Sequence, residues 1–464
     1  MTDPRPDTLR RLAHETWDVL IIGGGINGAG VARDLALRAA ALPGGLRIAL
    51  VEKNYFSSGT SGRNSQLIHG GLRYLKYGDF GLVKEALHER ATLLHIAPAL
   101  VRPLEFLIPC YQRFDRLFYG AGLTLYDALA GSRSLHPHRA INAKQAATLE
   151  PNLAANGLLG GVLFHDAAVH SARLVLENLL DAESHGACIA NYVEVHPNGA
   201  TLEACDRLTG NTFELKARHI LDATGSWSTA SPLRLVRGSH LIYPRIQQGS
   251  EAIAHFDEQG RIIFLIPWGE NNDLTLVGTT DVDHETDADH VAISPAESHY
   301  LKSIVRRLYP HFHADPITSY SSLRPLIVES GRSATETSRE HRIWESGDGV
   351  VHIAGGKYTT YRAMAEEAVD TLWPDLAPGH HVTSATAGIP FHLPKIPASP
   401  EARVTMAVER EHARRIPDVI YTSTYWGHER ALSRDWLLPL AQQMATLLHW
   451  DNSQLEHELR HVLP

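Results

Sequence analysis

WDVLIIGGGINGAGVARDLALRAA, from Trp17 to Ala40, is the stretch that decides the fold. Its Val19–Ile22 segment is a continuous apolar run, which is typical of a buried parallel strand. Gly23, Gly25 and Gly28 then give the spacing GxGxxG at the start of a helical pattern. The first glycine permits a tight turn, the second lets the backbone approach a pyrophosphate, and the third allows close packing of helix on strand.

A second apolar strand, LRIALVEK, follows a Pro-Gly-Gly turn and carries Glu52 at its carboxyl end. A helix N-terminus attracts phosphate groups, because its unpaired N–H groups and its dipole favour negative charge. An acid at the end of the second strand can accept hydrogen bonds from ribose hydroxyls. Strand, glycine motif, helix, strand and acid together predict a dinucleotide-binding unit.

Two later segments also place glycines at the ends of apolar strands. They are LDATGSW, from Leu221 to Trp227, and VVHIAGGKYTTYRAMAEEAVDTL, from Val350 to Leu372. The second of these again has a strand, a glycine pair and then a helical pattern. Three such segments, widely separated in the sequence, favour one long cofactor lying across a discontinuous domain. We therefore expect FAD rather than NAD.

The segments between these motifs predict a second domain. RLVRGSHLIYPRI, GRIIFLIPW and DLTLVGTTDV are short β-rich runs separated by polar turns. After about Pro390, closely spaced prolines suggest a linker, and EARVTMAVEREHARRI and DWLLPLAQQMATLLHW have helical spacing.

The predicted class is α/β: a discontinuous Rossmann-type FAD-binding domain, an antiparallel β-rich substrate domain and a short helical C-terminal domain. The expected bounds are 15–235 with 345–388 for the FAD-binding domain, into which substrate-domain segments near 85–150 are inserted. The substrate domain is expected at 236–344 and the shortened helical domain at 389–464.

Composition narrows the functional class. The chain has 464 residues and a formal net charge of −9, which argues against a general nucleic-acid binder. Its three cysteines are far apart, which favours a reducing, cytoplasmic compartment, and its 28 histidines form no ligand spacing for a metal. The N-terminal residues lack the apolar core of a signal peptide, and no apolar window is long enough to span a membrane.

Several motifs together resemble FAD-dependent glycerol-3-phosphate dehydrogenase, a family within the D-amino-acid-oxidase-like flavoproteins. They run in order from about Asp18 to Asp370: DVLIIGGGINGAGVARDLALR, LIHGGLRYLKYGDFGLVKEAL, DATGSW, VRGSHLI, LIPW, VGTTDV, LRPL and AGGKYTTYRAMAEEAVD. The resemblance implies oxidation of sn-glycerol 3-phosphate to dihydroxyacetone phosphate. Electrons would pass through FAD to a quinone or, in the oxidase branch, to oxygen.

Two features depart from the family pattern. The family usually has lysine before LIHGG, where this chain has Gln66, so cofactor contacts or redox tuning are expected to differ. The family's helical domain is also usually longer than the one expected here, where only about 75 residues follow Pro390. The shorter helical domain bears on oligomerisation, on membrane docking and on the choice of electron acceptor. A homodimer stays possible.

The reaction needs a base for a hydroxyl proton and cations for a phosphate. Arginine presents a fork of donors suited to phosphate, and a histidine of near-neutral pKa suits the proton. We favour His69 as the base, with His240 as its competitor. The predicted catalytic and substrate-binding residues are His69, His240, Arg73, Tyr74, Arg324, Arg339 and Lys357.

The same reasoning and the resemblance give a set of cofactor-binding residues. They are Gly23, Gly25, Gly28, Glu52, Lys53, Thr60, Ser61, Gln66, His69, Val193, Gly225, Trp227, Gly356, Lys357 and Thr359. No metal ligand is expected.

Two alternative functions stay open from the sequence. One is a related flavin oxidase that acts on an amino acid or a 2-hydroxy acid, which would also need an arginine for its carboxylate. The other is a non-catalytic flavin-binding protein, suggested by Gln66 and the short C-terminal region. The family's quinone-linked members lie on the inner face of the cytoplasmic membrane. LEFLIPCYQRFDRLFYGAGLTLYDAL, from Leu104 to Leu129, fits either a membrane-surface segment or a core helix pair.

Overall fold

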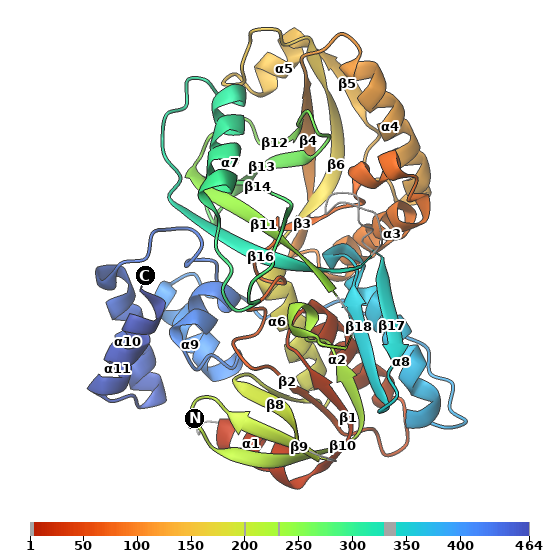
Figure 1. The fold of residues 1–464 in the computed structure, drawn as a ribbon, viewed down its shortest axis with the longest axis vertical. Coiled ribbons are helices and arrows are strands. Elements are labelled where there is room, and N and C mark those ends of the chain that lie inside the picture. The colour runs from red at the N-terminus through yellow and green to blue at the C-terminus, as the bar shows by residue number, and fades with distance from the viewer. Residues whose placement is uncertain (1–3, 199–200, 231–232, 329–339, 464) are drawn as a thin grey trace.

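The computed structural model describes residues 4–198, 201–230, 233–328 and 340–463. Two large sheets organise this part of the chain, one above the other in Figure 1, with the C-terminal helices packed beside them. The predicted α/β class is confirmed. All three cysteines, Cys110, Cys188 and Cys205, are free thiols.

The first sheet is the dinucleotide-binding sheet. Its strand order is β17-β18-β10-β1-β2-β7, and β8 and β9 extend it from β10. The bounds are β1 Thr16–Ile22, β2 Ile48–Val51, β7 Cys188–Ala190, β8 Val193–Asn198, β9 Thr201–Asp206, β10 Thr212–Asp222, β17 His341–Glu345 and β18 Val350–Gly355.

Strands β1, β2, β10 and β18 run parallel, so their carboxyl ends meet at one edge. This brings together the three glycine-bearing segments that are far apart in the sequence. The continuous apolar run of β1 reflects burial on both faces of the sheet.

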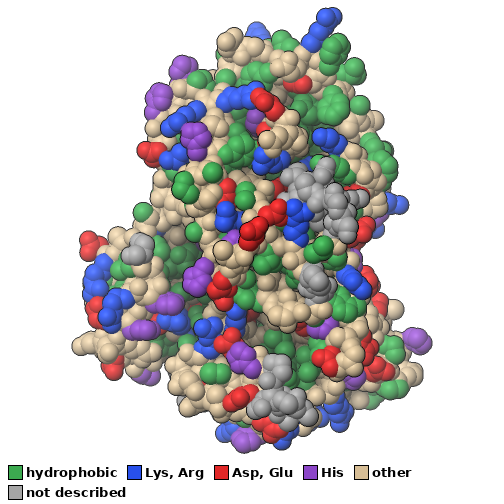
Figure 2. Space-filling model, viewed as in Figure 1, with side chains coloured by type: hydrophobic (Ala, Val, Ile, Leu, Met, Phe, Trp, Pro, Cys, Tyr) green, Lys and Arg blue, Asp and Glu red, His purple; other side chains and the backbone are tan. Residues whose placement is uncertain are grey.

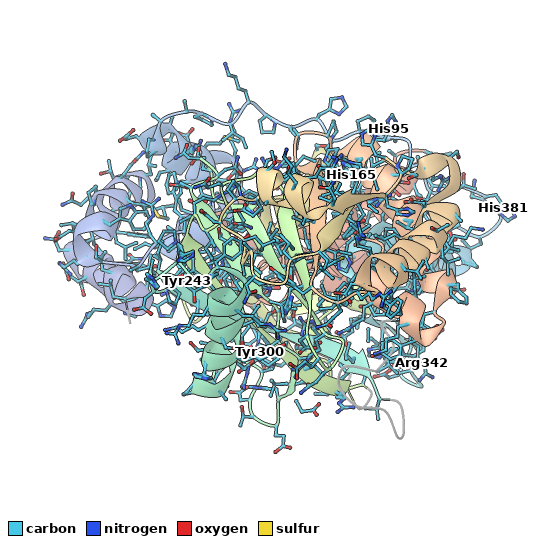
Figure 3. All side chains as sticks on the ribbon, turned by 90° about the horizontal axis from the view of Figure 1, so that it is seen from above. His95, His165, Tyr243, Tyr300, Arg342 and His381 are labelled. Carbon is cyan, nitrogen blue, oxygen red and sulfur yellow. The ribbon has the colours of Figure 1, made fainter. Side chains whose placement is uncertain are left out.

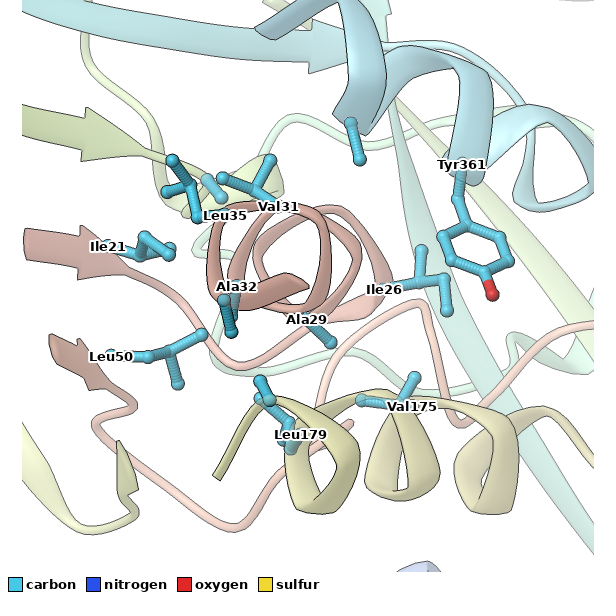
Figure 4. Packing of buried hydrophobic residues seen from close by; sticks show 14 of the residues in the cluster. Ile21, Ile26, Ala29, Val31, Ala32, Leu35, Leu50, Val175, Leu179 and Tyr361 are labelled. Atoms are coloured by element: carbon cyan, nitrogen blue, oxygen red, sulfur yellow. The ribbon is translucent and has the colours of Figure 1, made fainter. Parts of the chain in front are cut away.

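Helix α2 (Ile26–Ala39) begins at Gly25 and packs between this sheet and two further helices. Figure 4 shows it surrounded by Ile21 and Leu50 from the strands, by Val175 and Leu179 from α6 (Ser171–Ser184), and by Tyr361 from α8 (Tyr361–Leu376). Nearly every residue of α2 is buried, including polar ones, because neighbours cover it on several sides. The helix is therefore fixed firmly, and so is the glycine turn that precedes it.

The second sheet is mostly antiparallel. Its main order is β15-β11-β14-β13-β12-β4-β6-β3, with β16 paired to β11 and β5 paired to β6. The bounds are β3 Leu67–Ile68, β4 Val101–Cys110, β5 Arg139–Asn142, β6 Gly160–Val169, β11 Leu233–Pro244, β12 Ala252–Phe256, β13 Ile262–Trp268, β14 Leu274–Gly278, β15 Val282–Asp283 and β16 Thr318–Ile327.

The strands divide between the two sheets differently from the expected domain bounds. Strand β17 pairs with β18 in the first sheet, although most of it falls inside the 236–344 segment. Strand β11 begins before residue 236, and the inserted strands extend beyond the 85–150 segment, to β3 and β6. Strand pairing over such sequence separations is decided by tertiary packing, which local patterns do not encode.

Helices cover the edges and faces of the second sheet. They are α3 (Phe80–Ile96), α4 (Asp115–Ala130), α5 (Ala143–Leu149) and α7 (Pro295–Leu308). Figure 3 looks down on this layer, with Tyr300 marking α7 and His165 marking β6. Of the two alternatives for residues 104–129, the core helix pair is wrong, because β4 occupies the first part of this segment and pairs with β6 along ten residues.

The C-terminal part contains α9 (Pro400–Arg410), α10 (Arg434–Leu448) and α11 (Asn452–Val462), around their own apolar cluster. The helical expectation for this region is confirmed, although α9 ends at Arg410 and His412 adopts a left-handed φ of 59°. A π-helical turn, η5 (Asp418–Ser423), packs this part against α6.

The remaining helices are α1 (Arg5–His14) and the short turns η1 (Leu72–Tyr77), η2 (Gly131–Arg133), η3 (Gly225–Trp227) and η4 (Tyr358–Thr360).

Two surface properties bear on function. On the coloured part of the face in Figure 2, acidic and basic side chains are interspersed and form no extended basic stripe. Within the described ranges, no helix is long and apolar enough to cross a membrane.

Candidate active site

A cavity of about 570 Å³ lies between the two sheets. One end is lined by the carboxyl ends of β1, β2 and β18, and the other by residues of β6, β11, β13 and β16. It is large enough for a ligand bigger than most single metabolites. The glycine turn lies at the first end and the HGGLRY segment at the second.

The glycine turn is shaped so tightly that side chains are excluded. Gly23 has a φ of +115°, and a Cβ there would lie 2.6 Å from the carbonyl oxygen of Ala223. A Cβ on Gly28 would lie 2.0 Å from the carbonyl oxygen of Gly23. Gly23 and Gly25 border the cavity directly, and the N-terminus of α2 points at it. This is the geometry that a pyrophosphate needs.

Glu52 lies at the end of β2 and lines the cavity. One carboxylate oxygen accepts a hydrogen bond from Gly24 N at 2.7 Å, and the other accepts one from Asn54 N at 2.8 Å. Burial raises the pKa of this carboxyl, and the two backbone donors work against that shift. The acid is thus fixed at the place where ribose hydroxyls are expected.

The loop after β2 supplies further contacts along the cavity. Ser61 Oγ accepts a hydrogen bond from Ile26 N at 2.9 Å, and Thr60 Oγ1 donates to the carbonyl oxygen of Leu323. Lys53 Nζ lies 4.6 Å from the centroid of the Trp227 ring. Side chains of the loop therefore tie it to the backbone of α2 and of β16.

Most of the predicted cofactor-binding residues line this cavity. Those that do are Gly23, Gly25, Glu52, Lys53, Thr60, Ser61, His69, Val193, Gly225, Trp227, Gly356 and Lys357. Three do not: Gly28 lies behind the turn, Thr359 Oγ1 accepts a hydrogen bond from His69 N at 3.1 Å, and Gln66 is buried elsewhere.

Gln66 connects the loop to the C-terminal helices. Its Oε1 accepts a hydrogen bond from Ser171 N at 3.0 Å and another from the Tyr425 hydroxyl at 2.6 Å. The Gln66 side chain is 2% exposed, and its backbone has a left-handed φ of 56°. A protonated lysine, the usual residue of the family here, cannot accept a hydrogen bond. Glutamine therefore suits the two donors, Ser171 N and the Tyr425 hydroxyl, that this chain provides.

Arg73 and Arg324 meet at the other end of the cavity. Arg73 Nη1 lies 2.9 Å from one oxygen of Asp281, and Arg324 Nη1 lies 3.0 Å from the other. Arg324 also donates to the Thr279 hydroxyl at 2.9 Å. All four of these residues line the cavity, so two guanidinium groups lie together at this end of it.

Tyr74 and Lys357 complete the cationic end. Lys357 Nζ lies 4.0 Å from the centroid of the Tyr74 ring, and Arg73 Cζ lies 5.5 Å from the same centroid. Gly71 has a φ of +82°, and a Cβ there would lie 2.3 Å from the Tyr74 ring. The absence of a side chain at Gly71 therefore allows the Tyr74 ring and Lys357 to lie close to the backbone here.

The two candidate bases differ in their surroundings. His69 lines the cavity, and none of the described residues hydrogen-bonds its ring. His240 is 1% exposed, and its Nε2 lies 2.9 Å from Ser65 Oγ. Burial lowers the pKa of each to about 3, with Lys357 and Arg73 adding to the effect on His69. Both rings are thus neutral at pH 7, and His69 has the more available nitrogens.

Two acids at the site were missed by the sequence analysis. Asp281 lies in the quoted VGTTDV segment, but only the fold brings it between two arginines. Asp166 is a lone acid within the apolar strand β6, which is a signal that sequence inspection can find. Its carboxylate binds Arg90 at 2.6 Å and accepts a hydrogen bond from the Tyr126 hydroxyl at 2.8 Å.

The Tyr126 hydroxyl in turn accepts a hydrogen bond from Gly70 N at 2.8 Å. Asp166 thereby fixes the backbone next to His69. Arg339 lies outside the described residues. Within the described ranges, no cluster of three His, Cys, Asp or Glu side chains could hold a metal ion.

The family model for FAD-dependent oxidoreductases matches residues 18–370. The chain belongs to this family. The match covers the glycine turn, the cavity and both sheets, and it confirms the resemblance found in the sequence. FAD is the cofactor of FAD-dependent oxidoreductases, and the side-chain-free turn at Gly23 fits its pyrophosphate.

Curated relatives within this FAD-dependent group are named glycerol-3-phosphate dehydrogenases. Glycerol-3-phosphate dehydrogenase 2 of Mycobacterium tuberculosis is 36% identical over 384 residues, which are 78% of this chain and 64% of the relative. The aerobic glycerol-3-phosphate dehydrogenase of Staphylococcus haemolyticus is 34% identical over 400 residues, 81% of this chain and 70% of the relative. The chain thus spans about two thirds of the length of the relatives it matches.

Solved structures of FAD-dependent oxidoreductases share the fold. The glycerol-3-phosphate dehydrogenase of Bacillus halodurans, complexed with FAD, aligns with a TM-score of 0.78 at 24% identity, over 99% of this chain and 96% of that chain. The L-α-glycerophosphate oxidase of Mycoplasma pneumoniae, with FAD bound, aligns with a TM-score of 0.61 at 20% identity, over 80% and 96%.

Proposed function

We propose that this FAD-dependent oxidoreductase oxidises sn-glycerol 3-phosphate to dihydroxyacetone phosphate. The observation that carries the proposal is the convergence of Arg73, Arg324 and Lys357 beside His69 at one end of the cofactor cavity. Guanidinium groups bind phosphate oxygens through charge-assisted hydrogen bonds, and a lysine adds a point charge. The names of the curated relatives support the same substrate.

In the proposed reaction, each residue has a defined task. Arg73 and Arg324 bind the phosphate, and Asp281 keeps their guanidinium groups in place. His69 takes the proton of the hydroxyl group at the reacting carbon. Bound FAD supplies the acceptor for the hydride that leaves the same carbon.

The phosphate also prepares the base. Burial lowers the pKa of His69 most, and Lys357 and Arg73 lower it further, because they disfavour another positive charge nearby. A bound phosphate dianion offsets the field of these two cations, so the pKa of His69 is higher with the phosphate bound than in the empty cavity. The histidine is therefore a better proton acceptor when the correct substrate is bound than when the cavity is empty.

We propose a quinone as the electron acceptor, with oxygen as the alternative. The fold is shared with dehydrogenases and with an oxidase, so fold alone does not choose between them. Amino-acid oxidases share the fold as well, among them glycine oxidase of Geobacillus kaustophilus, with a TM-score of 0.59 at 20% identity. An amino-acid or 2-hydroxy-acid substrate would use its carboxylate where the phosphate is proposed.

The deciding experiment is anaerobic mixing of the FAD-loaded protein with sn-glycerol 3-phosphate while the visible flavin absorbance is followed. Rapid bleaching is expected, and glycine or lactate at equal concentration should leave the absorbance unchanged. Admitting oxygen or a quinone analogue afterwards identifies the acceptor from the rate of recovery. Bound FAD that no phosphorylated polyol reduces would refute the proposal and support a non-catalytic flavin protein.

We further propose that α4 contacts the surface of an anionic membrane. Phe114, Leu117 and Phe118 are 67%, 73% and 70% exposed, and the exposed Arg113 and Arg116 lie between and beside them. Exposed aromatic and apolar side chains with flanking arginines are typical of interfacial helices. A Phe114→Glu/Phe118→Glu variant that retains FAD should no longer pellet with anionic vesicles, whereas unchanged pelleting would rule out this helix.

A further inference from the structure

A second cavity, of about 230 Å³, lies on the other side of the loop Ser58–Thr60. The loop and Trp227 line both cavities, so they form a shared wall. The second cavity is also lined by Arg63, by residues of β16 and by Arg415 and His461 from the C-terminal part. Three separate regions of the chain therefore meet around it.

Arg63 differs from the buried arginines that form ion pairs. Its Nη2 donates to the Tyr55 hydroxyl at 2.8 Å, and no described carboxylate forms an ion pair with it. A buried charge without a counter-charge is costly, and buried arginines are therefore normally paired. Five buried arginines follow that rule, with the pairs Arg33–Asp181, Arg38–Asp34, Arg90–Asp166, Arg173–Glu411 and Arg362–Glu89.

The other charged residues of the second cavity do not neutralise Arg63. Asp289 lies 3.1 Å from Lys53 Nζ and accepts a hydrogen bond from Trp227 Nε1 at 2.8 Å. Arg415, on the C-terminal side, is paired with Glu458 at 2.8 Å. Among the described residues the acid in this wall, Asp289, is thus paired with Lys53 rather than with Arg63, and the acid that pairs with Arg415 lies away from the wall.

The remaining walls suit a small polar ligand. The aromatic residues Tyr55, Tyr192 and Trp227 and the serines Ser226, Ser321 and Ser322 line the space. A volume of about 230 Å³ is well below that of a dinucleotide site. It does accommodate a phosphate group or a small carboxylate.

We propose that the second cavity binds a small oxyanion, a phosphate or a carboxylate, which serves as the counter-charge of Arg63. The site is separate from the substrate-phosphate end of the main cavity, and it does not depend on the proposed reaction. Because Ser58, Gly59 and Thr60 line both cavities, an anion here also biases the loop that borders the cofactor. Any such coupling is reciprocal, so the anion and FAD change each other's affinity by the same factor.

The test is equilibrium dialysis of the FAD-loaded full chain against radiolabelled inorganic phosphate, with chloride keeping the ionic strength constant. Two phosphate ions per chain are expected at saturation. Arg63→Gln should remove one, with affinity at that site falling at least about tenfold, because it loses a charge-assisted contact. The matched control is Arg113→Gln, which changes an exposed arginine on another face and should leave both sites intact.

Arg324→Gln separates this proposal from the proposed function, because it should remove only the other phosphate. Retention of two sites by a folded, FAD-loaded Arg63→Gln protein would overturn the anion site. So would a single wild-type site that Arg324→Gln alone abolishes. If Arg63→Gln does not fold, Arg63→Lys keeps the charge and should retain both sites, with weaker binding at the second cavity. Replacing phosphate by citrate then distinguishes a phosphate site from a carboxylate site.

Discussion

Arg73 and Arg324 bind opposite oxygens of a single carboxylate, that of Asp281, at 2.9 and 3.0 Å. Arg73 belongs to the turn η1 and Arg324 to strand β16, so the carboxylate joins two distant parts of the chain. The pairing keeps two like-charged groups close together and aimed at one end of the cavity. A phosphate that binds there meets donors that are already oriented, which reduces the entropy cost of binding.

Removal of Arg324 should weaken binding of the phosphorylated substrate. We expect Arg324→Gln to raise the KM for sn-glycerol 3-phosphate by about 10- to 100-fold, the usual range for a lost charge-assisted hydrogen bond. Steady-state kinetics with glycerol as a second substrate provide the comparison, since glycerol has no phosphate and should be affected much less. Arg434→Gln, in an exposed ion pair with Glu456, is the control. An equal loss for both substrates would argue against the phosphate role.

The two histidines should differ in their effect on flavin reduction. His69→Gln is expected to slow the bleaching of the flavin by about 10²- to 10⁴-fold, the range for loss of a general base. His240→Gln should slow it less, because Ser65 already engages the Nε2 of His240. Stopped-flow absorbance under anaerobic conditions measures both. The reverse order of effects would make His240 the base.

The glycine turn gives a test of cofactor binding with a matched control. Gly28→Ala should sharply reduce the FAD content of the purified protein, because the new Cβ would lie 2.0 Å from a backbone oxygen. Gly81→Ala places a methyl group where no atom lies within 4 Å, in an exposed turn of α3. It should leave FAD content unchanged and stabilise the helix by up to about 1 kcal/mol. Flavin absorbance per chain and thermal melting measure the two effects.

Stability should fall as the pH drops below 6.5. Burial lowers the pKa of His69, His170, His240 and His428 to about 3, so the unfolded chain binds protons that the folded chain refuses between pH 6.5 and 3. Each of these histidines contributes about 1.4 kcal/mol of lost stability per pH unit across that window.

The melting temperature of a His428→Gln variant should therefore fall less between pH 7 and pH 5 than that of the wild type. The exposed His381 is the control position, because His381→Gln should leave the pH dependence of melting as it is. A His428→Gln protein whose melting temperature depends on pH as strongly as that of the wild type would contradict a lowered pKa for His428.

Gln66 should matter for the attachment of the C-terminal helices. Gln66→Lys removes the acceptor for Ser171 N and for the Tyr425 hydroxyl, and it puts a charge at a site that is 2% exposed. A loss of stability of about 1–3 kcal/mol is expected for each buried group left unsatisfied. Faster proteolysis near residues 389–399 and a lower melting temperature would report it. Tyr425→Phe removes the bond to Gln66 together with the bonds of the Tyr425 hydroxyl to Ala172 N and Ser171 Oγ, so it should lower the melting temperature as well.

The sequence by itself determined the dinucleotide-binding unit and the short segments that carry most of the candidate catalytic residues. Strand β1, the turn at Gly23 and helix α2 are adjacent in the chain, so their packing and their motif are encoded locally. The same holds for HGGLRY and for the glycine pair before Lys357, which lie at the cavity as short continuous stretches.

Only the tertiary structure decided which distant side chains share an environment. Asp281 between Arg73 and Arg324, and Gln66 against Tyr425, join residues that are far apart in the sequence. The fold likewise decides that Arg63 donates to Tyr55 and forms no ion pair with a carboxylate of the described residues. Periodicity and spacing report the local backbone, whereas burial, charge pairing and the pKa of a histidine depend on neighbours that folding brings in from elsewhere.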